Sequence, residues 1–224
     1  MTEASLVVEV LLCEQLELFL HRQSKGIYMV NSQDVHDGIT QSDDQSKQKR
    51  RSVPKWESAS RDRLRTAIRR FGKPLAELLD RDANEGDTRL FVTDFLCDAL
   101  GYDKYSDLTT EYMVRGDYAD YGVRIDKELV AFIEVKRIAT KLSTRHLRQV
   151  EMYAVNEGVE WIVLTNGAVW QVYHLGAGLP VEIQLALEVN LLGDESLGKR
   201  VDQLFYLTRE SLKRQQIDEL WRAK

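Results

Sequence analysis

Two acidic residues and a lysine stand where a β-hairpin would bring them together. Asp120 lies in a segment whose residues alternate in strand fashion, and Glu134 and Lys136 lie at the end of the apolar, β-branched run 129–135. These patterns are typical of two strands joined by a turn. A three-residue loop at 126–128 places Asp120 directly opposite Glu134, with the two carboxylates roughly 5 Å apart.

The paired carboxylates indicate a metal site. Like charges at the edge of an apolar core are destabilising unless one is protonated or a cation lies between them, and a divalent metal satisfies this arrangement best. Lys136 shares a strand face with Glu134, so it can hold an anion or a water beside the metal. A shift of one residue would turn Asp120 to the other face, so the inference depends on the loop length.

The spacing of these residues resembles a known pattern. Asp120 followed by Glu134-Val135-Lys136 resembles the metal-binding core of the PD-(D/E)XK nucleases. The downstream segment 149–153, Gln-Val-Glu-Met-Tyr, resembles the Gln-x-x-x-Tyr motif of one branch of that superfamily.

Two further segments narrow the resemblance. With 84–86, Asn-Glu-Gly, and 164–170, Leu-Thr-Asn-Gly-Ala-Val-Trp, the chain is similar to the N-terminal nuclease domain of type I restriction enzyme R subunits over roughly 58–192. Ala119 stands where many members carry proline, a change that touches no metal ligand. The resemblance implies an α/β fold, a mixed central β-sheet flanked by helices, of the restriction-endonuclease-like kind.

The resemblance also implies roles for individual residues. It implies a Mg²⁺-dependent endonuclease that hydrolyses DNA phosphodiester bonds, with Mn²⁺ as a substitute ion. Lys136 would orient or activate the attacking water, Gln149 would position the substrate or that lysine, and Tyr153 completes the motif. The implied metal ligands are Asp120, Glu134, the Val135 carbonyl and, from a preceding helix, Glu85.

Each of these residues also has a structural alternative. Glu85 in the first turn of a helix complements the helix dipole, and Gln149 and Tyr153, which share a helix face, fit a surface glutamine and a core tyrosine. A Glu-x-Lys pair on a strand is common. The alternative function is therefore a non-cleaving nucleic-acid-binding or protein-docking module with the same fold; the intact acidic cluster argues against it.

Charge is segregated along the chain. The formal net charge is −5, but residues 47–73 hold 11 Lys and Arg against 2 Asp and Glu. Neutralising phosphates with such side chains drives nucleic-acid binding, although a solvated helix face explains any single arginine equally well. The candidate DNA contacts lie on two predicted helices: Arg65, Arg69, Arg70, Arg145 and Arg148.

The chain divides into three parts. Residues 1–57 are predicted to be an N-terminal extension and disordered basic linker, 58–192 the nuclease domain, and 193–224 a C-terminal helical segment. Residues 5–20 could form a short helix, or the native chain could begin at Met29. The motor and translocation regions of a full R subunit are absent, so the nuclease would act alone or with a restriction-modification or motor subunit.

Periodicity predicts the remaining elements. Ser58 or Ser60 would cap the first helix of the domain, and Pro74 would break or kink it. The other predicted elements are a helix at 84–100 with Leu90 among its inward residues, a helix at 143–156, strands at 159–164, 168–175 and 182–192, and one or two helices over 201–222.

Composition excludes other classes. Cys13 and Cys97 are far apart, so neither a disulfide framework nor a zinc site is indicated and a reducing compartment is expected. No apolar run approaches the roughly 20 residues of a membrane span, so we expect no membrane and a cytoplasmic location. The segment 193–199 matches a phosphate-binding loop up to Lys199, but Arg200 replaces the magnesium-binding Ser or Thr, which favours an ordinary loop.

Overall fold

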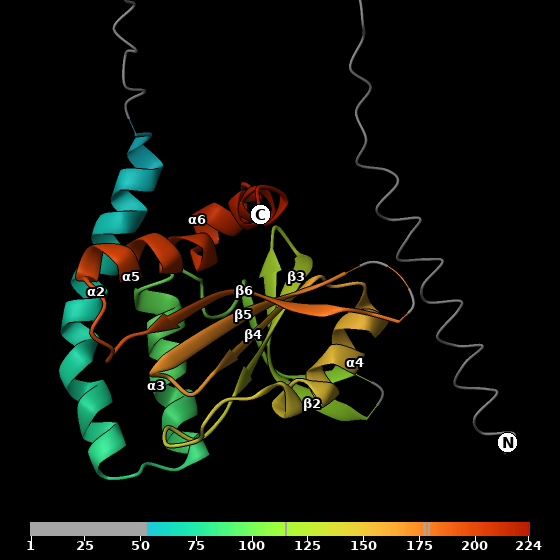
Figure 1. Cartoon of the computed structure of the whole chain (residues 1–224), viewed down its shortest axis with the longest axis horizontal. Helices are drawn as coiled ribbons and strands as arrows, with labels where there is room; N and C mark the ends of the chain where they lie inside the picture. Colours follow the sequence, from blue (N-terminus) through green and yellow to red (C-terminus); the bar gives the residue numbers. More distant parts are fainter. Residues whose placement is uncertain (1–52, 115, 177, 179) are drawn as a thin grey trace, which may run out of the picture.

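A computed structural model describes residues 53–114, 116–176, 178 and 180–224. The predicted helix at 5–20, the start choice at Met29 and almost all of the predicted linker lie outside these residues. Within them, a six-stranded mixed sheet has helices on both faces (Figure 1), which confirms the predicted α/β architecture.

The sheet follows the order of the chain. Its strands lie in the order β1-β2-β3-β4-β5-β6, and every neighbouring pair is antiparallel except β3 and β4. A parallel pair requires a crossover, which α4 (Arg148–Glu157) provides. The strands are Leu108–Val114, Asp117–Ile125, Glu128–Val135, Trp161–Thr165, Val169–Leu175 and Ile183–Asn190.

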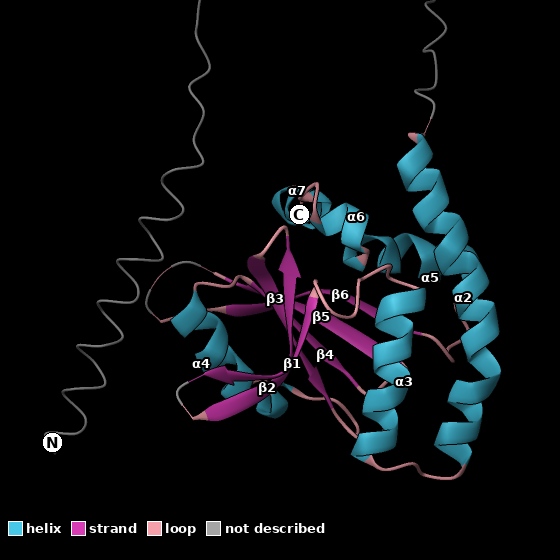
Figure 2. Ribbon diagram, turned by 180° about the vertical axis from the view of Figure 1, so that it is seen from behind, coloured by secondary structure: helices cyan, strands magenta, loops and turns pink. Residues whose placement is uncertain are grey.

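Helices cover the two faces of the sheet unequally. One face carries the larger core, formed with α2 (Lys55–Asp80), α3 (Glu85–Asp98) and the C-terminal helices, and the other carries α4 (Figure 2). The C-terminal helices are α5 (Leu197–Leu204), a 3₁₀ turn (Phe205–Leu207), α6 (Arg209–Leu212) and α7 (Gln216–Arg222), so the segment holds more helices than the one or two predicted.

Helix α2 differs from its prediction in three ways. It begins at Lys55 instead of Ser58, and it continues through Pro74 without a break. Neither serine caps it, since the Ser60 hydroxyl instead donates to the Trp56 carbonyl within the helix. Leu64 and Leu75, on either side of Pro74, are both fully buried, and this packing offsets the hydrogen bond that proline removes.

Helix α3 confirms its predicted place but not all of its predicted core. Phe91, Phe95 and Leu96 are buried as expected, whereas Leu90 is 69% exposed. Leu90 precedes Phe91 directly, so the two side chains point about 100° apart around a helix, and the buried stripe runs through Phe91 and Phe95.

The β2–β3 hairpin reaches the predicted register by a different route. Its turn has two residues, Asp126-Lys127, and not the three predicted at 126–128; both have positive φ, 51° and 75°, as in type I′ turns. A β-bulge opposite Val123 and Arg124 then adds one residue on β3. The shorter turn and the bulge cancel, so the pairing beyond the bulge is the predicted one.

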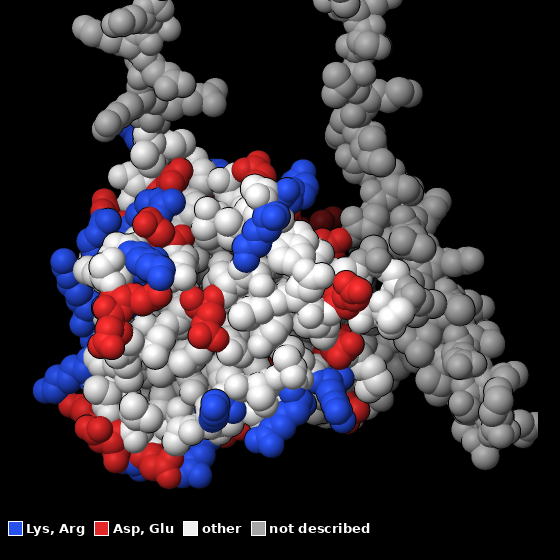
Figure 3. Space-filling view, in the orientation of Figure 1, with Lys and Arg blue, Asp and Glu red and all other residues white. Residues whose placement is uncertain are grey.

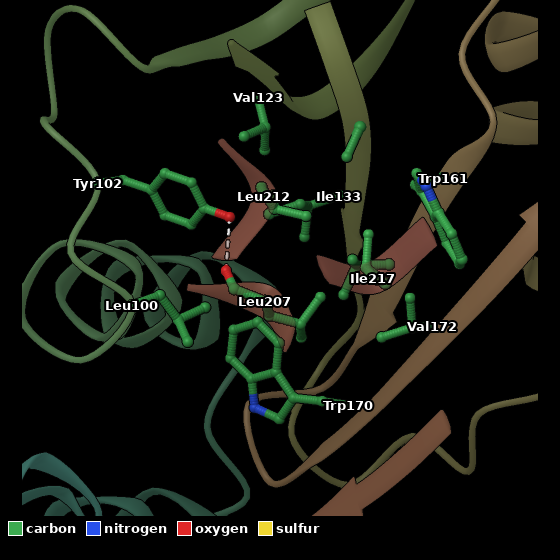
Figure 4. A pocket seen from close by; sticks show the side chains of 12 residues that line it. Leu100, Tyr102, Val123, Ile133, Trp161, Trp170, Val172, Leu207, Leu212 and Ile217 are labelled. Atoms are coloured by element: carbon green, nitrogen blue, oxygen red, sulfur yellow. Dashed lines mark hydrogen bonds between the residues drawn. The ribbon is translucent and has the colours of Figure 1, made fainter. Parts of the chain in front are cut away.

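The C-terminal segment packs into the same core as the sheet. Val201, Leu204 and Phe205 are almost fully buried there, and the Tyr102 hydroxyl donates to the Leu207 carbonyl over 2.7 Å. A cavity of about 10 Å³ lies between these helices and the sheet, and Figure 4 shows Val172 among its lining side chains.

Three smaller expectations can be compared with the described part of the chain. Residues 193–196 form an irregular loop before α5, as expected for an ordinary loop, and Lys199 pairs with Glu195. Cys97 is a free thiol. No helix among the described residues is long and apolar enough to cross a membrane.

Candidate active site

The site lies where β2 and β3 separate. The last recorded pair of the ladder is Tyr121 with Ile133, and one residue further along each strand stand Asp120 and Glu134. The Val135 N–H donates to Asp120 Oδ2 over 2.8 Å. The Asp120 carboxylate thus satisfies an amide of the opposite strand, and the structure brings the two predicted acids together.

Two cations neutralise these carboxylates. Lys136 Nζ lies 2.6 Å from Glu134 Oε1, which confirms that the two side chains share a face. Arg89 Nη2, from α3, lies 3.0 Å from Asp120 Oδ1. Arg89 is not among the residues predicted from the sequence; the available signal was its one-turn spacing from Glu85, which puts both side chains on one face of α3.

Burial sets the protonation behaviour of the site. Desolvation raises the pKa of Asp120, although the Val135 N–H and Arg89 oppose it. Desolvation likewise raises the pKa of Glu134 against the hydrogen bond from Lys136. Burial works to lower the pKa of Lys136, but the hydrogen bond to Glu134 and the surrounding carboxylates outweigh it, so that pKa is raised. The two acids are therefore incompletely compensated for the loss of water.

The first turn of α3 faces the same site. Asn84 caps the helix by accepting from the Asp87 N–H over 2.8 Å, and Glu85 follows it. The negative charge of Glu85 contributes to raising the pKa of both Asp120 and Lys136, so it lies close enough to act on them.

Polar contacts also fix the loop that follows β3. Thr88 Oγ1 of α3 accepts from the Ile138 N–H over 3.1 Å. The Asn166 side chain, in the predicted turn between β4 and β5, donates to the Thr140 carbonyl over 3.0 Å. The loop is therefore anchored to both α3 and the β4–β5 turn, which holds Lys136 at its start.

The residues present suit a hard divalent cation. No three His, Cys, Asp or Glu side chains in the described ranges already form a metal cage. Mg²⁺ needs less: it is usually held by one or two carboxylates and keeps several waters for the substrate to replace. Asp120, Glu134 and the Val135 carbonyl supply oxygen donors only, and the two chain cations beside them show that the site attracts positive charge.

Helix α4 carries the predicted glutamine–tyrosine motif. A 3₁₀ turn (Thr144–His146) precedes it, and Gly158 ends it with a φ of 66°. The Tyr153 ring is 1% exposed and meets Phe132 edge to face at 6.4 Å, so Tyr153 contributes to the core that holds the helix. The Gln149 backbone lies in α4, one turn before Tyr153, while its side chain lies outside what the structure describes.

The predicted DNA contacts separate into two groups. Arg145, in the 3₁₀ turn before α4, and Arg148, the first residue of α4, are exposed. Figure 3 shows Lys and Arg side chains gathered along the lower edge, over the segment that joins β3 to α4. The α2 group lies on the outer side of α3, away from β3 (Figures 1 and 2).

Most of the α2 arginines already have acidic partners. Arg65 pairs with Asp62 at 2.6 Å and Arg70 with Asp98 at 2.5 Å, while Arg69 is exposed. The basic stretch seen in the sequence is therefore partly neutralised in the fold, and the structure does not bring it to the carboxylates.

Fold and site together define an α/β domain with two carboxylates and a lysine at the opening of a hairpin. Residues 84–180 match the family model of the type I restriction enzyme R protein N terminus. The matched segment contains Glu85, Arg89, the β2–β3 hairpin and α4, so the chain resembles that domain over these residues. Neither the curated proteins nor the solved structures contain a match to the chain.

Proposed function

We propose that this domain is a Mg²⁺-dependent endonuclease that hydrolyses DNA phosphodiester bonds. The observation that carries the proposal is the pair Asp120 and Glu134 at the opening of the β2–β3 ladder, with Lys136 bonded to Glu134. Asp120, Glu134 and the Val135 carbonyl would hold the ion, and Glu85 would support it from α3. When bound, the ion neutralises the negative charge that develops on the scissile phosphate.

Lys136 and α4 have distinct roles in this proposal. Lys136 donates a hydrogen bond to Glu134, and the carboxylates around it hold its pKa above the ordinary value, which favours the charged form. As a cation it orients the attacking water or stabilises the developing oxyanion. Gln149 positions the substrate or the lysine from α4. Tyr153 acts indirectly, since its buried ring fixes the helix that carries Gln149.

The proposed path of the DNA follows the exposed arginines nearest the site. Arg145, in the 3₁₀ turn, and Arg148, at the start of α4, follow the anchored loop and would contact the DNA backbone beside the scissile phosphate. Arg65, Arg69 and Arg70 would add long-range attraction from α2. A restriction-modification or motor subunit is the proposed protein partner, on the strength of the family match.

A plasmid-nicking assay with and without Mg²⁺ tests the proposal. Glu134→Gln keeps the size of the side chain but removes a charge from the metal site, so nicking should be abolished and Mg²⁺ or Mn²⁺ should bind more weakly in calorimetry. Glu128→Gln, an exposed position on the same strand, is the matched control and should cut like wild type. A wild-type protein that binds no divalent ion would exclude the proposal.

A second function is favoured by one observation. Both carboxylates are already paired with cations of the chain, Asp120 with Arg89 and Glu134 with Lys136, as in a domain that binds nucleic acid or a protein partner without cutting. In that case wild type would bind DNA without nicking it when Mg²⁺ is present, and Glu134→Gln would bind DNA as wild type does.

A further inference from the structure

Arg89 stands among acidic residues from three elements. Its guanidinium lies 3.0 Å from Asp120 of β2 and 3.7 Å from Glu111 of β1, and Glu85 precedes it by one turn on α3. Its backbone is fixed, because its carbonyl accepts from the Tyr121 hydroxyl over 3.0 Å and from Thr93 Oγ1 over 2.8 Å. The root of the side chain is therefore rigidly placed, with its charged end at the site.

The guanidinium itself is incompletely bonded. Arg89 Nε is enclosed and has no acceptor among the described residues. The Glu111 oxygen lies beyond hydrogen-bond distance, and the Glu111 side chain is 72% exposed. Only the contact to Asp120 is close, so the arrangement leaves much of the donor capacity of Arg89 unused.

A divalent cation at Asp120 would change this arrangement. Two cations cannot share one carboxylate closely in a partly buried site, since their repulsion is strong at low dielectric. Arg89 would then need another anion, and the substrate phosphate is the anion that the proposed reaction brings. A guanidinium forms a planar fork that binds two phosphate oxygens at once, which would use the donors left free in the resting state.

We propose that Arg89 is a phosphate-binding residue that exchanges Asp120 for the non-bridging oxygens of the DNA when the metal binds. This inference rests on the proposed nuclease function and adds a coupling between metal binding and DNA binding. Metal binding releases Arg89 from Asp120, and the released Arg89 then raises the affinity for DNA. The other arginines near this end of α3 pair with acids outside the site, Arg81 with Asp87 and Arg137 with Asp82.

The coupling makes the test specific. Arg89→Gln should bind Mn²⁺ alone several-fold more tightly in calorimetry, because a competing cation is gone. With Ca²⁺ present to fill the site, the variant should bind a DNA duplex about tenfold more weakly, and the dependence of log affinity on log salt should lose about one unit of slope. In chelator, where Arg89 stays on Asp120, wild type and variant should bind DNA equally.

Two further variants complete the design. Arg81→Gln changes an exposed arginine that pairs with Asp87 of α3, outside the site; it is the control and should match wild type in every measurement. Arg89→Lys keeps the charge but loses the fork, so it should retain wild-type metal affinity and lose part of the Ca²⁺-dependent DNA affinity; it also serves if Arg89→Gln does not fold.

The outcomes separate this inference from the proposed function. If wild type binds Mn²⁺ but Arg89→Gln changes neither metal affinity nor Ca²⁺-dependent DNA affinity, Arg89 is only a structural ion pair and the nuclease proposal stands. Equal loss of DNA binding with and without metal would also overturn the exchange. If wild type binds no divalent ion, both proposals fall together.

Discussion

Two pairs of carboxylates in this fold are held by arginine or lysine, and they behave differently. At the hairpin opening, Asp120 meets Arg89 and Glu134 meets Lys136. At the junction with the C-terminal segment, Asp107 meets Arg209 at 2.6 Å. At the same junction, the Glu210 carboxylate accepts hydrogen bonds from both terminal nitrogens of Arg63, over 2.8 and 2.6 Å.

The difference lies in how completely each carboxylate is satisfied. Burial works to raise the pKa of Glu210, but the paired hydrogen bonds and charge of Arg63 outweigh it, so that pKa lies below its ordinary value. Desolvation raises the pKa of Asp120 and Glu134, and their partners do not compensate for it. Ion pairs of a similar kind therefore stabilise the junction, whereas at the hairpin opening they do not fully compensate the two carboxylates for the loss of water.

This contrast separates structure from function. Asp107 also accepts from the Asp103 N–H over 2.8 Å, so the junction acids are fully engaged in holding the C-terminal helices to the sheet. Asp120 and Glu134, in contrast, can still bind a further cation. Incomplete compensation at a buried edge is a common property of functional sites, where stability is lower than it could be.

The largest expected effect is on turnover. Lys136→Ala leaves the carboxylates in place and removes a competing cation, so metal binding should persist or strengthen while nicking falls about 10²- to 10³-fold, because the water or oxyanion loses its positioned charge. Lys104→Ala, an exposed lysine away from the site, is the control. Undiminished nicking by Lys136→Ala would show that the lysine is structural.

The next effect is on stability at the junction. Arg209→Ala leaves Asp107, which is 3% exposed, without its cation, and should lower the free energy of unfolding by about 3 kcal/mol in urea denaturation. Mg²⁺ affinity of the folded variant should be unchanged. A loss below about 0.5 kcal/mol would mean that the junction pair does not stabilise the fold as the comparison requires.

The free energy of unfolding should depend on pH through the ionisation of Glu210. Because its pKa is lowered in the folded state, its contribution is present above its ordinary value and is lost as the pH falls through the folded value. Glu210→Gln should therefore lower stability by about 1–2 kcal/mol at pH 7 and by less in acid, where wild type loses the same contribution. Parallel urea curves at pH 7 and pH 4 measure this, and a constant difference between them would contradict it.

The same substitution at the site should have the opposite sign. Without metal, Glu134→Gln removes a desolvated charge and its repulsion with Asp120, so the free energy of unfolding at pH 7 should rise by about 1 kcal/mol. Thermal melting in chelator measures the change. A clear drop in melting temperature would show that Glu134, like Asp107 and Glu210, stabilises the fold.

The smallest effect concerns the cavity beside the junction. Val172→Ile adds one methylene group toward a space of about 10 Å³ and should raise stability by about 0.5 kcal/mol with no change in nicking. A lower melting temperature would show that the surrounding side chains cannot accommodate the added volume.

Much of the fold was accessible from the sequence because its signals are local. The alternating and β-branched runs predicted β2 and β3, the apolar stripe through Phe91 and Phe95 predicted α3, and the Asn166-Gly167 dipeptide predicted the β4–β5 turn. The register of Asp120 against Glu134 was also predicted, although the loop length used to obtain it was wrong. The bulge that restores the register depends on packing within the sheet, which local sequence does not report.

The sequence by itself determined which groups carry the chemistry: two carboxylates and a lysine whose strand spacing puts them at one hairpin. Only the tertiary structure decided how they are neutralised, because Arg89 comes from a helix packed beside the strands and no spacing links it to Asp120. It also decided that Arg65 and Arg70 of α2 are paired with nearby acids, while Arg145 and Arg148 stay exposed. Charge compensation depends on distances in space, and those are set by the packing of the whole domain.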